Sequence, residues 1–186
     1  MPRNIRFMSI RTILLTGFTC CFALAIFASG ALFEPANANP PPLAPVDQRA
    51  DFVEVDKSDR EMRLLRDGEV IQRYQVSLGF APEGDKEREG DGKTPEGRYT
   101  IDYRNPQSSF HLSLHISYPD ASDRSEAKAR GDDPGGEIFI HGGPRNVPDA
   151  LWQGTDWTLG CVSVTDEEMT EIWSLVPDGT PIEIRP

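Results

Sequence analysis

Cys161 and His141 are the residues whose chemistry most directly suggests a reaction. The other two cysteines, Cys20 and Cys21, lie in an apolar N-terminal stretch, so Cys161 stands alone in the rest of the chain. A free thiol has a pKa of about 8.5 and is mostly protonated at neutral pH, so a nucleophilic cysteine needs a base within hydrogen-bonding reach. His141 is the candidate base. The alternative is a structural histidine with an inert buried thiol, which behaves as a small hydrophobic group.

Glycines flank both residues. His141 follows an apolar run, residues 137–140, and precedes Gly142, whose carbonyl could hold the second ring nitrogen as the third group of a catalytic triad does. Gly160 lets the backbone turn tightly before Cys161, and the amides of these two residues could point at a developing oxyanion. Because both segments lie at predicted strand ends of one β domain, we expect the imidazole and the thiol to be neighbours.

The remaining histidines, His111 and His115, do not form a metal site. They fall in residues 110–118, where alternating apolar residues predict a strand, and four residues of a strand span about 13 Å. Two ligands cannot share one ion across that gap, and the domain offers no second cysteine, so no metal is expected. We interpret His111 as facing solvent, whereas for His115 solvent-facing and pocket-lining positions both remain open.

The elements that must position these residues are mainly strands. Several runs bounded by turn residues alternate apolar and polar side chains, which is typical of strands. We expect strands at residues 52–55, 62–65, 74–78, 99–103, 110–118, 137–140 and 182–184. One amphipathic helix is predicted after Thr165, which forms a capping box with Glu168, and the charged segment 120–136 is predicted to be a surface loop or lid. The expected fold is therefore mainly β, with one amphipathic helix near the C-terminus.

The N-terminus has the pattern of an export segment. Three arginines precede the uncharged residues 12–33, and Ala36-Asn37-Ala38 offers a cleavage site of the small-x-small type. We expect residues 1–38 to be a signal peptide or an N-terminal membrane anchor, because the uncharged run is long enough to cross a bilayer. The protein is then exported to the periplasm or cell wall, and only an uncleaved N-terminal segment would attach it to the membrane.

The rest of the chain reads as one linker and one domain. Residues 39–50 are rich in proline and are expected to form a linker, and residues 51–186 are expected to form a single domain. The chain has 186 residues and a net charge of −11. An acidic surface repels phosphate groups, so nucleic acid is not expected as a partner.

The spacing around the two reactive residues resembles a known family. His141-Gly142, followed after fifteen residues by Thr158-Leu159-Gly160-Cys161, is similar to the signature of the L,D-transpeptidase catalytic-domain family. That family carries a histidine and, downstream, a Ser/Thr-His-Gly-Cys run. Residues 93–99 and the predicted last strand also look like family segments, so the resemblance extends over nearly all of residues 51–186. It implies a mixed, β-sandwich-like fold.

The resemblance also implies an activity on peptidoglycan. Cys161 would attack the carbonyl of the third residue of a stem peptide, meso-diaminopimelate or its equivalent, and release the terminal D-alanine. His141 would accept the thiol proton. An amine would then resolve the thioester, giving a cross-link or an attached lipoprotein, or water would hydrolyse it. No metal or organic cofactor is implied. Tyr118, His115 and Thr158 are the expected substrate-binding residues, and Tyr118 also fits a core position.

The chain departs from the family pattern at two positions. Leu159 stands where the family has a histidine, and Ser163 stands where an arginine or asparagine is common. The run from Gly160 to Thr165 looks closer to a subset that includes an amidase detaching lipoprotein from peptidoglycan. Three functions therefore remain open. They are an L,D-transpeptidase, an amidase or carboxypeptidase that uses the same Cys–His site with water as acceptor, and a non-catalytic β-module that binds the wall.

Overall fold

The computed structural model describes residues 40–186, and the segment 1–38, predicted to be a signal peptide or anchor, lies outside the described residues. The described part of the chain contains eight strands, two α-helices and two short 3₁₀ helices, Val46–Gln48 and Asp149–Leu151. Among these residues, no helix is both long enough and apolar enough to cross a membrane.

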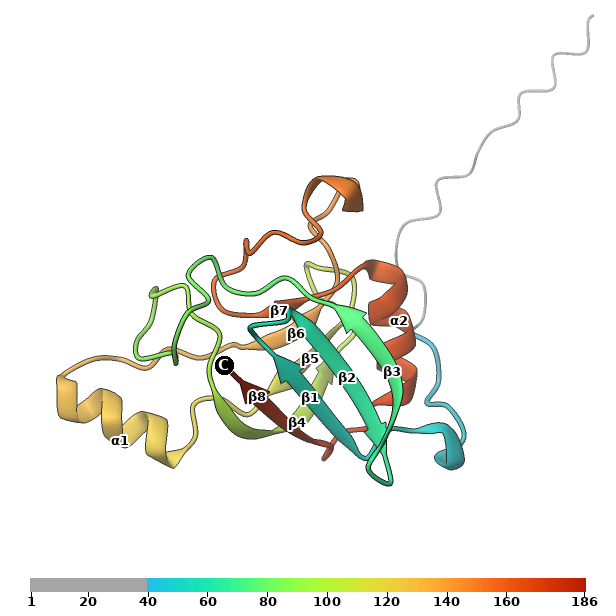
Figure 1. The fold of residues 1–186 in the computed structure, drawn as a ribbon, viewed down its shortest axis with the longest axis horizontal. Coiled ribbons are helices and arrows are strands. Elements are labelled where there is room, and N and C mark those ends of the chain that lie inside the picture. The colour runs from blue at the N-terminus through green and yellow to red at the C-terminus, as the bar shows by residue number, and fades with distance from the viewer. Residues whose placement is uncertain (1–39) are drawn as a thin grey trace, which may run out of the picture. The chain divides into compact units, whose positions relative to one another are not determined.

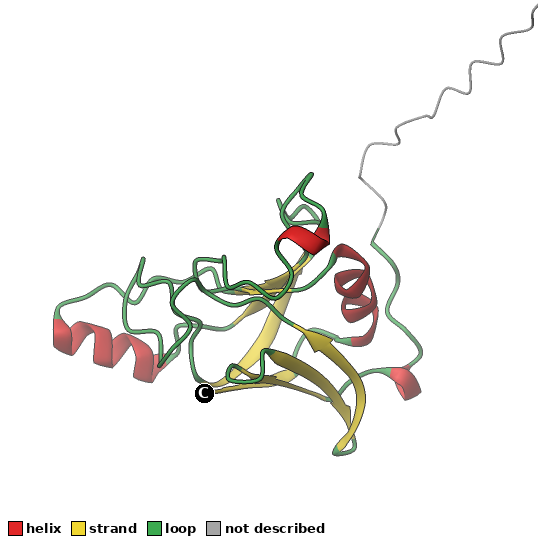
Figure 2. Ribbon diagram, turned by 45° about the horizontal axis from the view of Figure 1, so that its top comes forward, coloured by secondary structure: helices red, strands yellow, loops and turns green. Residues whose placement is uncertain are grey.

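The eight strands form a single curled sheet in the order β3-β2-β1-β8-β4-β5-β6-β7 (Figures 1 and 2). Their bounds are Phe52–Asp56 (β1), Glu61–Arg66 (β2), Glu69–Gln75 (β3), Gly97–Asn105 (β4), Ser113–Ile116 (β5), Phe139–His141 (β6), Val162–Ser163 (β7) and Pro181–Arg185 (β8). Two neighbouring pairs, β1–β8 and β6–β7, are parallel, and the others are antiparallel. The prediction of a mainly β fold is confirmed.

The core follows directly from the alternation in the sequence. Val53 of β1 lies opposite Leu64 of β2 and Ile182 of β8, and all three side chains are fully buried. Each such side chain contributes about 1.5–3 kcal/mol when it leaves water. Asp67-Gly68 closes the β2–β3 hairpin with φ of 51° and 80°, the left-handed backbone that a tight hairpin turn requires.

The predicted C-terminal helix is α2, Asp166–Leu175. Thr165 caps it, accepting from the amide of Glu168, while the carboxylate of Glu168 accepts from the amide of Thr165. Its buried residues are Met169, Ile172 and Trp173, which join the core and lie against β5 and β6. The capping box and the apolar stripe are confirmed.

A second helix, α1, lies where a surface loop or lid was predicted. It spans Ala121–Arg130, so that prediction was wrong for these ten residues. Asp120 and Asp123 form its capping box, and Gly131 ends it with a φ of 82°. Only Ala127 is buried, so the helix has no apolar stripe that periodicity could reveal. Figure 1 shows α1 standing at the edge of the domain, away from the sheet.

The predicted strand 110–118 is also shorter than expected, because β5 covers only Ser113–Ile116. His111 has a φ of 66°, and its ring Nε2 lies 2.8 Å from Oγ1 of Thr170 on α2. A left-handed residue breaks the alternation, so His111 and His115 do not lie on one extended strand.

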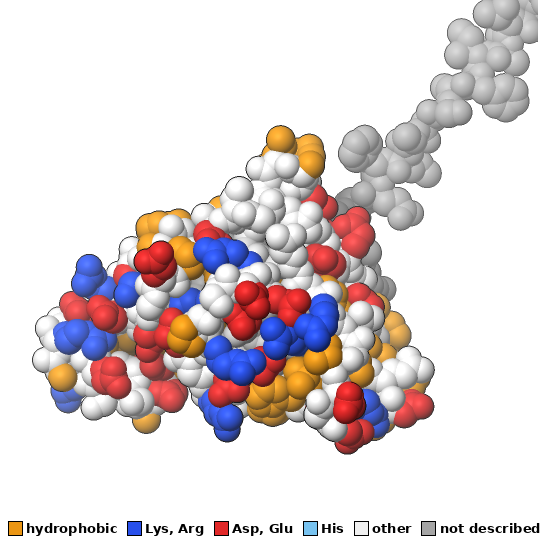
Figure 3. Space-filling view, viewed as in Figure 1, with side chains coloured by type: hydrophobic (Ala, Val, Ile, Leu, Met, Phe, Trp, Pro, Cys, Tyr) orange, Lys and Arg blue, Asp and Glu red, His pale blue; other side chains and the backbone are white. Residues whose placement is uncertain are grey.

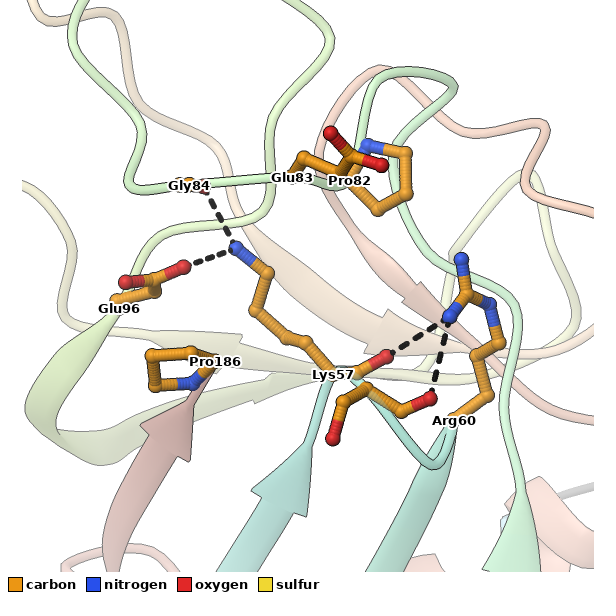
Figure 4. Close-up of a pocket in the computed structure, with 8 residues that line it drawn as sticks. Lys57, Arg60, Pro82, Glu83, Gly84, Glu96 and Pro186 are labelled. Carbon is orange, nitrogen blue, oxygen red and sulfur yellow. Dashed lines mark hydrogen bonds and ion pairs between the residues drawn. The ribbon is translucent and has the colours of Figure 1, made fainter.

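The long connection between β3 and β4 is fixed by a buried lysine. Nζ of Lys57 donates to the carbonyls of Gly84 (2.7 Å) and Thr94 (3.0 Å) and to Oε1 of Glu96 (2.7 Å). Figure 4 shows Lys57 reaching Gly84 and Glu96 across a cavity of about 370 Å³. All three ammonium protons are used, so we interpret Lys57 as a clamp that holds this connection against the end of β1.

The proline-rich linker ends as an ordered segment. The amides of Ala44 and Ala50 donate to the carbonyls of Ser174 and Leu175, each at 2.9 Å. The guanidinium of Arg49 donates back to the carbonyl of Ala44. Residues 44–50 are therefore bound to the C-terminal end of α2.

Candidate active site

The sheet register brings Cys161 and His141 to one face. Strands β6 and β7 run parallel with Ile140 opposite Val162 and His141 opposite Ser163. Side chains alternate along strands, and Ile140 and Val162 are fully buried in the core, so His141 and Ser163 point to the other face. Cys161 directly precedes Val162 and therefore shares the face of His141.

The imidazole of His141 is held by backbone. Its Nδ1 lies 2.7 Å from the carbonyl oxygen of Gly142, and the hydroxyl of Ser163 donates to the same oxygen at 3.1 Å. A carbonyl can only accept, so Nδ1 carries the proton and Nε2 is left as the basic nitrogen. The Gly142 carbonyl contact is the one expected from the sequence.

Aromatic rings enclose the imidazole. Phe110 stacks on His141 with ring centroids 4.6 Å apart, and Trp157 approaches edge-on at 5.7 Å. Burial in this setting lowers the pKa of His141 below its usual value of 6.5, because the charged ring would lose its hydration. The neutral, proton-accepting form is therefore dominant at pH 7.

Gly142 and Gly143 are required by space. A Cβ on Gly142 would lie 2.3 Å from Oδ1 of Asp166, and one on Gly143 would lie 2.6 Å from the indole of Trp152. The same Asp166 oxygen accepts from the amide of Gly143 at 2.9 Å. Asp166 is the first residue of α2. The start of this helix therefore fixes the Gly142–Gly143 turn, and the carbonyl of Gly142 orients the imidazole of His141.

The thiol of Cys161 is partly buried and donates to the carbonyl of Glu137 at 3.5 Å. Burial raises its pKa above that of a free thiol; the carboxylate of Glu137 acts in the same direction, and the ammonium of Lys86 opposes it. A raised thiol pKa beside a lowered imidazole pKa means that the resting pair is neutral. A neutral thiol of this kind can act as a nucleophile only where a base removes its proton during the attack, which is general base catalysis.

Thr158 shapes the turn before the thiol. Its hydroxyl donates to the carbonyl of Cys161 at 2.8 Å and accepts from the amide of Gly160 at 3.1 Å. Gly160 has a φ of 134° and packs against the carbonyl of Lys93, so a side chain there would collide. Since Thr158 engages the Gly160 amide, the geometry does not favour that amide as an oxyanion donor. The amide of Cys161 is the better candidate.

Two cavities meet at the reactive pair. The larger, of about 450 Å³, is bordered by Thr158 and Leu159, and the smaller, of about 330 Å³, is bordered by Asn105 and Phe139. Both are lined by Phe110, Glu137, His141 and Cys161. Leu159, which replaces the family's histidine, is 75% exposed, and its apolar side chain has no group that could hydrogen-bond to a ligand.

Of the three expected substrate-binding residues, only Thr158 borders one of the two cavities. Tyr118 is only 3% exposed, and its hydroxyl donates to the carbonyl of Pro134, so it occupies the core position also considered for it. His115 lies on the same sheet face as His141, but it does not border either cavity. Thr158 borders the larger cavity.

Sequence reasoning missed five residues that surround the site. They are Lys86, Phe110, Glu137, Trp157 and Asp166. Lys86 is buried against Asp91 at 2.7 Å and borders the larger cavity. None of the five lies within three residues of Cys161 or His141 in the sequence, so local spacing carried no signal. The left-handed φ of Glu137, 55°, is visible only in the structure.

A thiol and a backbone-oriented imidazole at the ends of adjacent strands define a candidate cysteine acyl-transfer site. The profile of the family described as "YkuD: L,D-transpeptidase catalytic domain" matches residues 50–184. The chain belongs to the L,D-transpeptidase catalytic-domain family.

Several individual proteins are similar to this chain. The candidate L,D-transpeptidase YafK of Escherichia coli K12 is 28% identical over 131 residues, which cover 67% of this chain and 46% of YafK. The helical cell shape determining protein Pgp2 of Campylobacter jejuni superposes with a TM-score of 0.57 at 22% identity, covering 80% of this chain and 52% of Pgp2. Bd1075 of Bdellovibrio bacteriovorus gives 0.52 at 24% identity, with 77% and 51% covered. The chain thus spans about half the length of these relatives.

Proposed function

We propose that the protein is an exported L,D-transpeptidase that acts on peptidoglycan stem peptides through a Cys161 thioester. The observation that carries the proposal is the register of β6 and β7, which puts Cys161 and His141 on one sheet face between two cavities. A structural cysteine needs neither a neighbouring base nor access to a cavity.

The reaction follows from the protonation states of the pair. Nε2 of His141 takes the thiol proton as Sγ of Cys161 bonds to the carbonyl carbon of the third stem residue. The C–N bond to the terminal D-alanine breaks, and the imidazolium returns the proton to the departing amine, leaving a thioester. His141 then deprotonates the acceptor, an amine or water, which displaces the thiol. Protons and bonds balance without a cofactor.

Two cavities suit a reaction with two substrates. We assign the acyl donor to the smaller cavity and the acceptor amine to the larger one. The larger cavity is bordered by the carboxylate of Glu89, which the smaller cavity lacks and which attracts an ammonium group. Water as acceptor gives the hydrolase alternative, an amidase or carboxypeptidase including release of a wall-linked lipoprotein. The hydrolase alternative remains open because Leu159 and Ser163 depart from the family pattern.

Product masses separate these outcomes. The full-length protein is incubated with a disaccharide-tetrapeptide muropeptide, and the products are weighed by mass spectrometry. A cross-linked dimer or exchange of the terminal D-alanine identifies a transferase, and tripeptide alone identifies a hydrolase. Cys161→Ala abolishes both. If Cys161→Ala forms product as fast as the wild type, the proposed mechanism is wrong. If the wild-type protein instead binds purified sacculi without turnover, it is a wall-binding module.

Export is part of the same proposal. Residues 1–38, which lie outside the described residues, serve as a signal peptide or as a membrane anchor. Mass determination of the protein recovered from fractionated cells checks this. A mature chain lacking about 38 residues indicates cleavage, and an intact chain in the membrane fraction indicates an anchor. Recovery of the intact chain in the cytoplasm contradicts export.

A further inference from the structure

We propose that Tyr103, His115 and Phe139 form an aromatic platform that binds an amino-sugar ring of the glycan from which the donor stem peptide hangs. The inference rests on the proposed function, since it places the rest of the same substrate. It adds a saccharide subsite to the protein. The site lies on the sheet face that carries Cys161 and His141.

The platform is one row of the sheet. Tyr103 of β4 lies opposite His115 of β5, which lies opposite Phe139 of β6. The rings of Tyr103 and His115 are stacked with centroids 4.4 Å apart, and Phe139 meets the edge of His115 at 4.9 Å. Continuing the β6–β7 register by one residue puts Cys161 opposite Phe139, and both border the smaller cavity. The aromatic row therefore leads to the nucleophile.

A second row runs beside the first. Asn105 lies opposite Ser113, which lies opposite His141. The intervening residues Leu114 and Ile140 are fully buried on the other face, in the core with α2. One continuous face thus carries the aromatic platform, a polar row and the reactive pair.

The chemistry of this face fits a neutral sugar. Tyr103 is 42% exposed despite its size, and the ring of His115 is fixed by a 2.6 Å hydrogen bond from Nδ1 to Asp102. Aromatic faces attract the C–H groups of a pyranose ring because the face is electron-rich. Besides Phe139 and the four residues that it shares with the larger cavity, the smaller cavity is lined by neutral amides and hydroxyls, which match sugar hydroxyl and N-acetyl groups. They belong to Asn105, Gln107, Ser108, Ser109 and Ser113.

The span between the platform and the nucleophile fits the substrate. Three neighbouring-strand spacings separate Tyr103 from the position of Cys161, about 14 Å in all. In the proposed donor, three stem residues lie between the sugar and the reacting carbonyl, and they reach about 10 Å when extended. The lactyl ether that joins the stem to the sugar supplies the remainder. A donor lying along the row would place its sugar at Tyr103.

The test compares two donors that differ only in the sugar. Release of D-alanine by the full-length protein is measured with the disaccharide-tetrapeptide and with the free tetrapeptide, and the ratio of the two kcat/KM values is taken. The wild type should prefer the glycosylated donor about three- to tenfold, the worth of one aromatic contact. Tyr103→Ala should bring the ratio close to one, through KM, whereas Tyr103→Phe should keep it. Val70→Ala, at an exposed apolar position on β3, is the matched control.

Each possible ratio of the two kcat/KM values supports or overturns the aromatic platform. A wild-type ratio near one, or an unchanged ratio in Tyr103→Ala, overturns the platform while leaving the proposed function standing. If Tyr103→Ala does not fold, Gln107→Ala in the exposed turn after β4 should also lower the ratio. If neither donor is processed, the proposed function fails. Titrating Cys161→Ala with the reduced disaccharide, followed by NMR, then tests the sugar site alone, and absence of binding overturns it.

Discussion

Burial acts in opposite directions on the pKa values of the two residues of the proposed catalytic pair. It lowers the pKa of His141 below 6.5 and raises the pKa of Cys161 above 9.0, so both groups are neutral over a wide pH range. Many catalytic cysteines are instead poised as thiolates. In the proposed mechanism the imidazole acts during the attack, which makes its protonation state the main control on rate.

The pH profile follows with a definite sign. As pH falls, activity should persist until the imidazole becomes protonated, so the acid limb of kcat/KM should have its midpoint below 6.5. His141→Ala should remove that limb and lower kcat/KM by about 10²- to 10⁴-fold. The rate of Cys161 alkylation by iodoacetamide should rise with a midpoint above 9.0. An alkylation midpoint near neutrality would show a thiolate–imidazolium pair instead.

Asp166 should act on the reaction through the Gly142–Gly143 turn. Asp166→Ala removes the acceptor of the Gly143 amide, and the lost hydrogen bond should cost about 1–2 kcal/mol, seen as a roughly tenfold lower kcat. Asp166→Asn keeps an acceptor oxygen and should restore most of kcat. The carboxylate also raises the pKa of His141, so Asp166→Asn should shift the acid limb to lower pH. A structural role alone would leave that limb unmoved.

At the scale of elements, the site depends on the connection between β3 and β4. This connection supplies Lys86, Glu89 and Gly90 to the larger cavity, and Lys57 clamps it. The side chain of Lys57 is only 4% exposed. Its three hydrogen bonds therefore take the place of the hydrogen bonds to water that the ammonium group would make in solvent.

Lys57→Met should therefore lower the free energy of unfolding by about 2–4 kcal/mol, because it leaves two carbonyls and Glu96 without a partner. Arg98→Met is the matched control, since it removes another cation paired with a glutamate, but one that is 78% exposed. Its effect should stay within about 0.5 kcal/mol. Urea unfolding measures both. Equal losses in the two variants would show that Lys57 is not a clamp.

The two helices show what a sequence can and cannot reveal at this scale. Helix α2 was predictable because its apolar stripe must pack against the sheet. The helical spacing of the apolar residues that stabilises it is visible in the sequence. Helix α1 buries only Ala127, so it is stabilised by its caps and by local propensity. An Asp120–Asp123 capping box in a charged segment reads equally well as a turn.

At the scale of the molecule, the juxtaposition of Cys161 and His141 was predictable, and the cavities around them were not. Residue type, the flanking glycines and order along the chain pointed to Cys161 and His141. Their cavity depends on a mixed sheet whose last strand β8 sits between β1 and β4, and no local pattern encodes that order. The aromatic row with Tyr103 exists only because β4, β5 and β6 are in one register.

On the face shown in Figure 3, charge is dispersed rather than concentrated. The net charge of −11 does not gather into a single acidic surface on the face shown in Figure 3, where acidic and basic side chains are interspersed. Recognition of substrate is then expected to depend on the cavities and the sheet face more than on long-range attraction.

The way the domain is joined to its N-terminal segment can be tested by trimming. Residues 44–50 bind the end of α2 through the amides of Ala44 and Ala50, and Ala50 is buried. A chain that starts at residue 51 should therefore have an unfolding free energy about 1–3 kcal/mol lower than one that starts at residue 40. Urea unfolding of the two chains, compared at equal slope, measures the difference. Equal stability would mean that residues 44–50 are only a spacer. The predicted loss would mean that these residues belong to the folded domain.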